Sequence, residues 1–161
     1  MPAPSDATPG NTPPGNEVAA RLTQLAEEFA DLEPRERLEL LLDYAERLPK
    51  LPEKYQAERD AGLHRIRECQ TPVFLWVELP NGHVQVIADA APEAPTVKGF
   101  VNVLREAFGG ATPADALAVD QNLVQQFGLA EVLGMVRMRG LLSIQAALRR
   151  QIRAAHESET T

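Results

Sequence analysis

The sequence contains a single cysteine, Cys69, among 161 residues. One thiol has no partner for an intramolecular disulfide and is too few for a thiolate metal site. Cys69 therefore either packs as an inert apolar side chain or carries chemistry at one sulfur. An unpaired cysteine is also typical of a reducing compartment, where thiols stay free.

Long hydrophobic runs and an excess of basic charge are missing as well. No stretch approaches the roughly 18 consecutive apolar residues needed to cross a bilayer, and the amino terminus lacks the basic start and apolar core of a secretory signal. The formal net charge of −7 argues against a nucleic-acid binder, which neutralises phosphates with a basic surface. We therefore predict a cytoplasmic protein with no nucleic-acid or membrane partner.

Length and composition predict one domain. With 44% hydrophobic residues, a chain of 161 residues buries one substantial core but not two. Residues 1–16 are rich in proline and glycine and poor in residues that pack, which predicts a disordered tail. We expect the domain to span residues 17–157 and residues 158–161 to form a frayed end.

Apolar residues recur at helical spacing on both sides of a central segment. They predict a first helix from Val18 and a second from Pro34, which ends before Pro49 and Pro52. Further helices are predicted over residues 97–108, after the capping sequence Thr112-Pro113, over residues 120–128 and over residues 141–152.

The central segment predicts strands. A short one is expected at residues 63–67, and a stronger one at Val73–Leu79 is rich in β-branched and aromatic residues. The turn Pro80-Asn81-Gly82 then leads into a returning strand that contains residues 84–88. Cys69 falls in the loop between the first two strands. The order of elements predicts an α+β fold, in which a small antiparallel sheet of about three strands packs against a layer of helices.

Three cationic residues, His64, Arg65 and Arg67, precede Cys69 and would stabilise a thiolate if they also lay close to it in space. The alternative is a buried, unreactive cysteine, since free cysteine is among the most buried residue types. The polar residues around Cys69 are typical of a loop, where functional residues concentrate. The residues alone leave both interpretations open.

Other kinds of site find little support. A cysteine hydrolase needs a histidine base, and the candidates are His64, His83 on the predicted hairpin and His156 near the end of the chain. One cysteine and three scattered histidines lack the closely spaced ligand pairs of a metal site, so we assign no metal. Gly109-Gly110 ends a predicted helix and is more typical of a helix stop than of a phosphate-binding loop.

Four segments stand in the order and spacing of one known family. They are Glu33-Pro34-Arg35-Glu36-Arg37 through Leu48-Pro49-Lys50-Leu51-Pro52, Glu68-Cys69-Gln70-Thr71-Pro72-Val73-Phe74-Leu75, Thr96-Val97-Lys98-Gly99-Phe100, and Val136-Arg137-Met138-Arg139-Gly140-Leu141. Over residues 20–155 the chain thereby resembles the SufE family of sulfur-acceptor proteins, which partner cysteine desulfurases in iron–sulfur cluster assembly. It departs from the family where Glu68 replaces a glycine, Thr71 a serine, Phe74 a tryptophan and Val136 a serine.

The resemblance implies that Cys69 takes sulfur from the persulfide of a SufS-like cysteine desulfurase, for delivery to a SufBCD-type cluster scaffold. It implies a carrier and activator without independent turnover and without a cofactor, because pyridoxal phosphate belongs to the desulfurase. Gln70, Lys98 and Arg137 are implied as partner-binding or loop-stabilising residues. We expect the loop to hide the thiol in the free protein, and the sequence leaves a homodimer open.

Two other interpretations remain. An iron–sulfur scaffold needs about three cysteine ligands, so with one cysteine a cluster would have to bridge a dimer. A degenerate interaction module would use Cys69 only for packing and would bind its partner through acidic helices.

Overall fold

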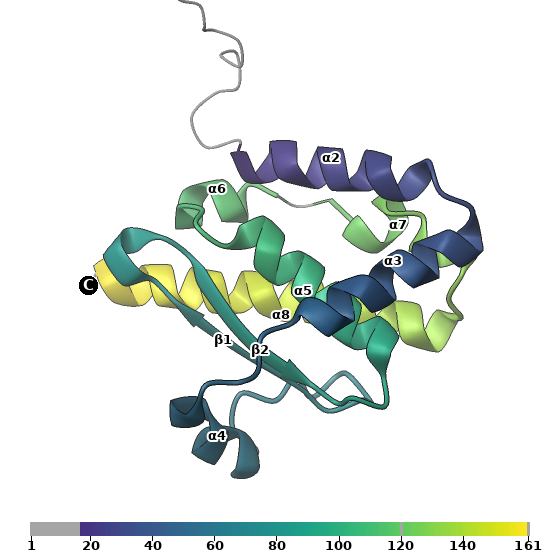
Figure 1. The fold of residues 1–161 in the computed structure, drawn as a ribbon. Coiled ribbons are helices and arrows are strands. Elements are labelled where there is room, and N and C mark those ends of the chain that lie inside the picture. The colour runs from purple at the N-terminus through teal and green to yellow at the C-terminus, as the bar shows by residue number, and fades with distance from the viewer. Residues whose placement is uncertain (1–16, 120, 161) are drawn as a thin grey trace, which may run out of the picture.

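The computed structural model describes residues 17–119 and 121–160, so the tail predicted over residues 1–16 lies outside it. Its helices and strands are α2 (Glu17–Ala30), α3 (Pro34–Arg47), α4 (Glu53–Asp60), β1 (Val73–Glu78), β2 (Gln85–Ala90), α5 (Pro95–Phe108), α6 (Pro113–Leu117), α7 (Leu123–Gln126) and α8 (Met135–Thr160). Figure 1 shows the two strands lying beside a layer of helices. The predicted α+β fold class is therefore confirmed.

The two strands form an antiparallel hairpin, in which Val73 lies opposite Ala90 and Glu78 opposite Gln85. A 3₁₀ turn at Pro80–Gly82 joins them. Within this turn Asn81 has a φ of 56° and Gly82 a φ of 80°, the positive values that Asn-Gly adopts most easily. The predicted hairpin is confirmed, with its second strand beginning at Gln85.

The predicted strand over residues 63–67 is wrong, and the sheet has two strands rather than about three. Gly62 and His64 have φ values of 81° and 65°, which turn the chain out of the extended conformation. What remains is an isolated bridge between Arg65 and Phe74. Two hydrogen bonds join the segment to the edge of β1 that faces away from β2, and the chain then continues into the loop that contains Cys69.

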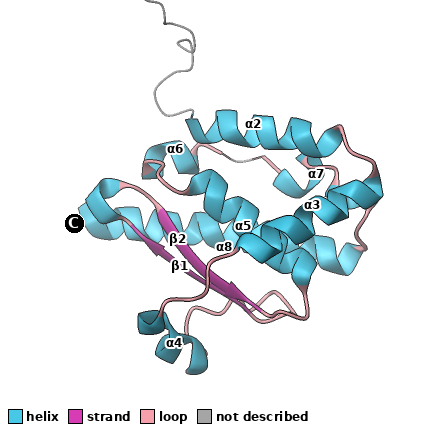
Figure 2. Cartoon of the chain, viewed as in Figure 1, coloured by secondary structure: helices cyan, strands magenta, loops and turns pink. Residues whose placement is uncertain are grey.

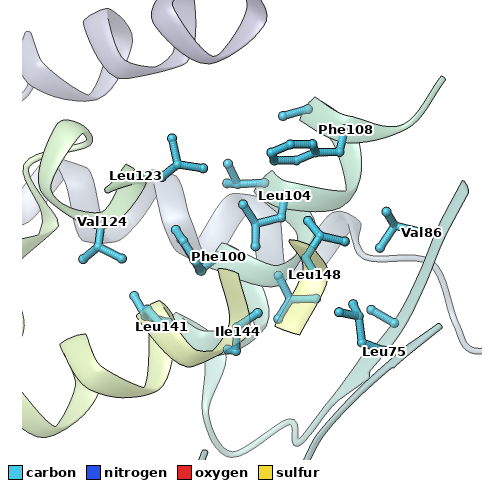
Figure 3. Packing of buried hydrophobic residues seen from close by; sticks show 14 of the residues in the cluster. Leu75, Val86, Phe100, Leu104, Phe108, Leu123, Val124, Leu141, Ile144 and Leu148 are labelled. Atoms are coloured by element: carbon cyan, nitrogen blue, oxygen red, sulfur yellow. The ribbon is translucent and has the colours of Figure 1, made fainter. Parts of the chain in front are cut away.

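The inner face of the sheet carries the main core. α5 packs on β2, α8 packs on β1, and α3 lies against α5 on the side away from the sheet. Side chains from these layers meet in Figure 3, among them Leu75, Val86, Phe100, Leu104, Ile144 and Leu148. Burying such side chains contributes about 1.5–3 kcal/mol each, which makes this contact the main source of stability.

The outer face of the sheet is covered by α4, which the sequence analysis did not predict. Figure 2 shows α4 on the opposite side of the strands from the other helices. Tyr55 of α4 and Leu51 before it pack on Trp76 and Ile87 in a second, smaller cluster. Because both faces are covered, each strand has buried residues on its two sides.

The helix ends follow their local signals. The Thr112 side chain accepts a hydrogen bond of 3.2 Å from the Asp115 amide at the start of α6, as its capping position predicts. α7 is capped by Asn122, while Asp120 lies outside the described residues. α8 begins before Leu141 and runs through residues 158–160. None of the helices in the described ranges is both long and apolar enough to cross a membrane.

Candidate functional site

Cys69 lies on the loop that leads into β1, at the end of the sheet opposite the hairpin turn. Two backbone hydrogen bonds close the loop: Ile66 N–H donates to the Val73 carbonyl over 2.9 Å, and Ala91 N–H to the Pro72 carbonyl over 3.1 Å. The Cys69 amide itself donates to the Ile66 carbonyl at 3.3 Å. The Cys69 side chain is 4% exposed and belongs to the main core.

A cavity of about 250 Å³ lies beside the thiol. Its walls are the cysteine loop, the start of α5 and the first turns of α8, and they comprise Glu68, Cys69, Gln70, Val97, Val136, Arg137, Arg139 and Gly140. Gly140 faces the sulfur: a Cβ added there would lie 3.5 Å from Cys69 Sγ. The structure thus brings together the cysteine and arginine motifs, which are far apart in sequence.

Burial has the largest effect on the pKa of the Cys69 thiol. It raises the Cys69 pKa, and this outweighs the opposing effects of a hydrogen bond from the Thr71 backbone and of the Arg65 charge. Of the neighbouring cations, Arg65 lowers the thiol pKa, as predicted for a cation that lies close in space, but burial outweighs its effect. The buried Cys69 is a protonated thiol at neutral pH, which makes it a poor nucleophile until its surroundings change.

His64 and His83 are not placed to act as a base for Cys69. The ring of His64 stacks on Trp76 at a centroid distance of 5.2 Å, and Trp76 points to the outer face of β1. Cys69 packs with the inner-face core, so the strand separates the two side chains. His83 contacts the Asn81 carbonyl at the hairpin turn, at the far end of the sheet. This arrangement does not support a cysteine hydrolase.

The outer rim of the cavity is exposed, apolar and basic. Val136, which lines the cavity, and Met135, which precedes it, are 64% and 71% exposed, although both are large hydrophobic residues. Arg137 and Arg139 follow them and have no acidic partner among the described residues. Met135 was not predicted as part of the site, and Val136 was identified only within the arginine segment. Their signal was an apolar pair that lies off the stripe of Leu141, Ile144 and Leu148.

The substitution of glutamate for the family's glycine before Cys69 fits without backbone strain. Among the described non-glycine residues only His64 and Asn81 have positive φ, so Glu68 does not require a conformation that favours glycine. Its carboxylate lies 3.7 Å from a guanidinium nitrogen of Arg150 on α8. This half-exposed ion pair is a further contact between the loop and α8.

The remaining predicted site residues are divided between two cavities. Gln70 lines the cysteine cavity, as does Arg137. Lys98 instead lines a neighbouring cavity of about 490 Å³ on the other side of the first turn of α5. Within the described ranges no three histidine, cysteine or acidic side chains are grouped so that they could hold a metal ion.

Comparisons with known proteins found a family model, curated relatives and a solved structure that are similar to this chain. The family model named SufE, an Fe-S metabolism associated domain, matches residues 23–152. An uncharacterized SufE-like protein of Mycobacterium tuberculosis is 34% identical over 140 residues, which are 86% of this chain and 95% of that protein. One from Synechocystis is 27% identical over 124 residues, or 76% and 74% of the two chains. The solution structure of a hypothetical protein from Thermus thermophilus has a TM-score of 0.73 and 34% identity, and the match covers 85% of this chain and 96% of that one.

Proposed function

Since this chain belongs to the SufE family, whose domain is associated with iron–sulfur metabolism, we propose that Cys69 accepts sulfur from the persulfide of a partner cysteine desulfurase. The observation that carries the proposal is the placement of the single cysteine. It lies on a loop, beside a cavity of about 250 Å³ and opposite a helix residue without a side chain. These features suit a thiol that must hold one additional atom.

The proposed transfer is a thiol–persulfide exchange. The Cys69 thiolate attacks the terminal sulfur of the donor persulfide, a new S–S bond forms at Cys69, and the old S–S bond breaks to release the donor cysteine as a thiolate. The proton of the Cys69 thiol passes to solvent or to the donor site. No oxidant or reductant is consumed, because the sulfane sulfur moves without a net change of oxidation state.

Docking of the desulfurase has to expose the thiol before this step. In the free protein Cys69 is 4% exposed and its pKa is raised by burial, so both access and nucleophilicity are low. Val136 on the cavity wall and Met135 before it offer an exposed apolar contact, and Arg137 adds a positive charge that has no acidic partner among the described residues. We expect a partner that covers this rim to release the cysteine loop from α8.

The partner is predicted to be a SufS-like cysteine desulfurase, which holds the pyridoxal phosphate, and the recipient of the sulfur a SufBCD-type scaffold. The chain itself would act as a carrier and activator. A cytoplasmic location and a homodimer stay predictions.

Intact-protein mass spectrometry under non-reducing conditions tests the proposal. The protein is incubated with a SufS-like desulfurase and cysteine, alongside Cys69→Ser. We expect the wild-type mass to increase by whole sulfur atoms, the increase to be reversed by a reductant, and the variant to remain unchanged. A wild-type protein that gains no sulfur from a desulfurase able to load another acceptor would refute the proposal.

A structural role for Cys69 is the second candidate, and the burial of the thiol favours it. A neutral thiol in a core packs as a small apolar side chain. In that case Cys69→Ala would bind and stimulate the desulfurase as well as the wild type does, and no sulfur would be found on the chain. Sulfur found on the wild-type chain, together with the binding and stimulation measured for Cys69→Ala, therefore separates the two candidates.

A further inference from the structure

A second cavity near the cysteine loop carries positive charge that the fold does not neutralise. It has a volume of about 490 Å³ and lies between residues 48–51, the end of β2 and the start of α5. Lys50, Lys98 and Arg59 contribute the cations, and Asp89 the only acidic side chain, among its lining residues. The whole chain has a formal net charge of −7, so a local excess of positive charge stands out.

Among the described residues, Arg59 in this cavity is paired with acidic side chains, whereas Lys50 and Lys98 are not. Arg59 lies 2.9 Å from Asp89 and 3.1 Å from Asp60, so its charge is already compensated. Lys50 and Lys98 have no acidic partner and no side-chain hydrogen bond in the part of the chain that the structure describes. Lys98 is nonetheless half-buried. Two uncompensated ammonium groups on one cavity favour a ligand with negative charge.

The backbone supplies a further donor. Val73 and Leu75 make their hydrogen bonds to residues 64–66, so their peptide groups face away from β2. Ala90 lies opposite Val73. Two residues that lie opposite each other in an antiparallel pair direct their peptide groups either both towards or both away from the partner strand, so the Ala90 N–H points to the free edge of β2. Ala90 is 4% exposed and lines the cavity, and its N–H has no acceptor among the described residues. A buried amide of this kind needs an acceptor, from water or from a ligand.

The cavity and Cys69 lie at the same end of the sheet. The hydrogen bond of 3.1 Å from Ala91 N–H to the Pro72 carbonyl joins the cavity wall to the cysteine loop. On α5, Val97 lines the cysteine cavity and the next residue, Lys98, lines the lysine cavity. A protein that covers the Cys69 loop therefore comes close to both lysines.

We infer that the lysine cavity is a second docking point, which receives an acidic side chain from the protein that delivers sulfur to Cys69. The inference rests on the proposed function. The partner's carboxylate interacts with Lys50 and Lys98 and accepts a hydrogen bond from the Ala90 amide. Its apolar contact is the rim formed by Met135 and Val136. Two separated contacts fix the orientation of the partner over the cysteine loop, which one contact would not.

Charge reversal at the two lysines tests the inference. We expect Lys50→Glu/Lys98→Glu to raise the Kd for the desulfurase about tenfold at low salt, with a smaller difference at high salt, because exposed charges mainly affect encounter and are screened. The matched control is Arg35→Glu/Arg153→Glu, which changes the net charge by the same amount at exposed positions outside both cavities. A glutamate at position 98 lies in the first turn of α5, where negative charge is favourable, so the fold should be retained.

The outcomes are distinct from those for the proposed function. If wild-type protein gains sulfur at Cys69 and both double variants bind the desulfurase equally well, the lysine cavity is not a docking point and the sulfur-acceptor role stands. If wild-type protein gains no sulfur, the proposed function fails first. If inorganic phosphate shifts the NMR signals of Lys98 while Lys50→Glu/Lys98→Glu docks like the control, the cavity binds a free anion and the inference is overturned.

Discussion

The α3–α5 contact and the Cys69 cavity each contain a helix glycine, but the two glycines have different neighbours. A Cβ added at Gly99 on α5 would lie 2.1 Å from the Leu41 carbonyl oxygen of α3, closer than two non-bonded atoms can approach. A Cβ added at Gly140 on α8 would lie 3.5 Å from Cys69 Sγ, which is an ordinary contact distance. The first glycine lets two helix backbones touch, whereas the second leaves space beside a reactive atom.

The α2–α3 junction and the Cys69 cavity differ in their polar groups. Near the α2–α3 junction, Arg37 donates to the carbonyls of Phe29, Leu32 and Gly128 at 3.0–3.1 Å and lies 2.6 Å from Glu131. Around Cys69, Arg137 and Arg139 have no such partners in the described part of the chain. One region uses its arginine for stability, and the other leaves arginines available for a partner.

The largest expected effect is that of Gly99→Ala. Because the new methyl group meets backbone atoms of Leu41, α3 and α5 must move apart, and we expect a loss of about 3 kcal/mol in the free energy of unfolding. Urea denaturation followed by circular dichroism measures it. Gly140→Ala is the matched control, and equal destabilisation by the two substitutions would abolish the distinction between the two glycines.

Arg37→Ala should rank second. It removes the donor to the Leu32 and Gly128 carbonyls and one of the two donors to the Phe29 carbonyl, which keeps the Leu32 amide, and this should cost about 2 kcal/mol in unfolding free energy. Arg35→Ala, on the same helix but exposed and without an ion pair in the described residues, should change stability by less than about 0.5 kcal/mol. Similar values for the two variants would mean that the Arg37 hydrogen bonds contribute nothing net.

The helical stripes and the hairpin were predictable because they follow from local rules. The periodic apolar residues of α2, α3 and α5 and the Asn-Gly turn act through neighbours in sequence. α4 was not predicted, since its mostly polar residues bury only Tyr55 and show no apolar stripe. The strand expected at residues 63–67 failed because Gly62 and His64 adopt positive φ, and the stacking of His64 on Trp76 is a tertiary contact that sequence spacing does not report.

The candidate site was predictable only in part, for a related reason. The cysteine and arginine motifs were identified as segments, and the structure brings Cys69, Arg137 and Gly140 to one cavity. Whether a cation near Cys69 in sequence lies near it in space depends on which face of β1 it occupies. His64 is on the outer face and Cys69 on the inner one, and the pKa of the thiol is set mainly by burial, which sequence spacing does not report.

Gly140→Ala should have a smaller effect on stability and the opposite sign. Replacing a helical glycine with alanine favours the helix by up to about 1 kcal/mol, and the contact at 3.5 Å from Sγ is tolerated by the thiol. The added methyl group takes up cavity volume beside the sulfur, so a persulfide on Cys69 should be held less well. We expect a shorter persulfide lifetime in dithiothreitol, measured by mass spectrometry. A more stable variant with an unchanged lifetime would show that the space at Gly140 does not serve the second sulfur.

The smallest expected effect is on the pH dependence of stability, and the comparison with Cys69→Ala reports on the Cys69 thiol alone. The native pKa of Cys69 is raised by burial, whereas the unfolded thiol has a pKa of about 8.5. Above that pH the unfolded chain loses its proton while the native thiol keeps it, so the native state is stabilised less as the pH rises from about 8.5 towards the native pKa.

Cys69→Ala lacks this titration but keeps all others, including that of Tyr55, whose pKa is raised to about 12 by burial and the hydrogen bond to Glu78. The difference in unfolding free energy between wild type and Cys69→Ala should therefore be constant below pH 8 and decrease above it. A difference that increases with pH would mean that the native protein favours the thiolate, and the cysteine region would then resemble a preformed reactive site rather than a closed one.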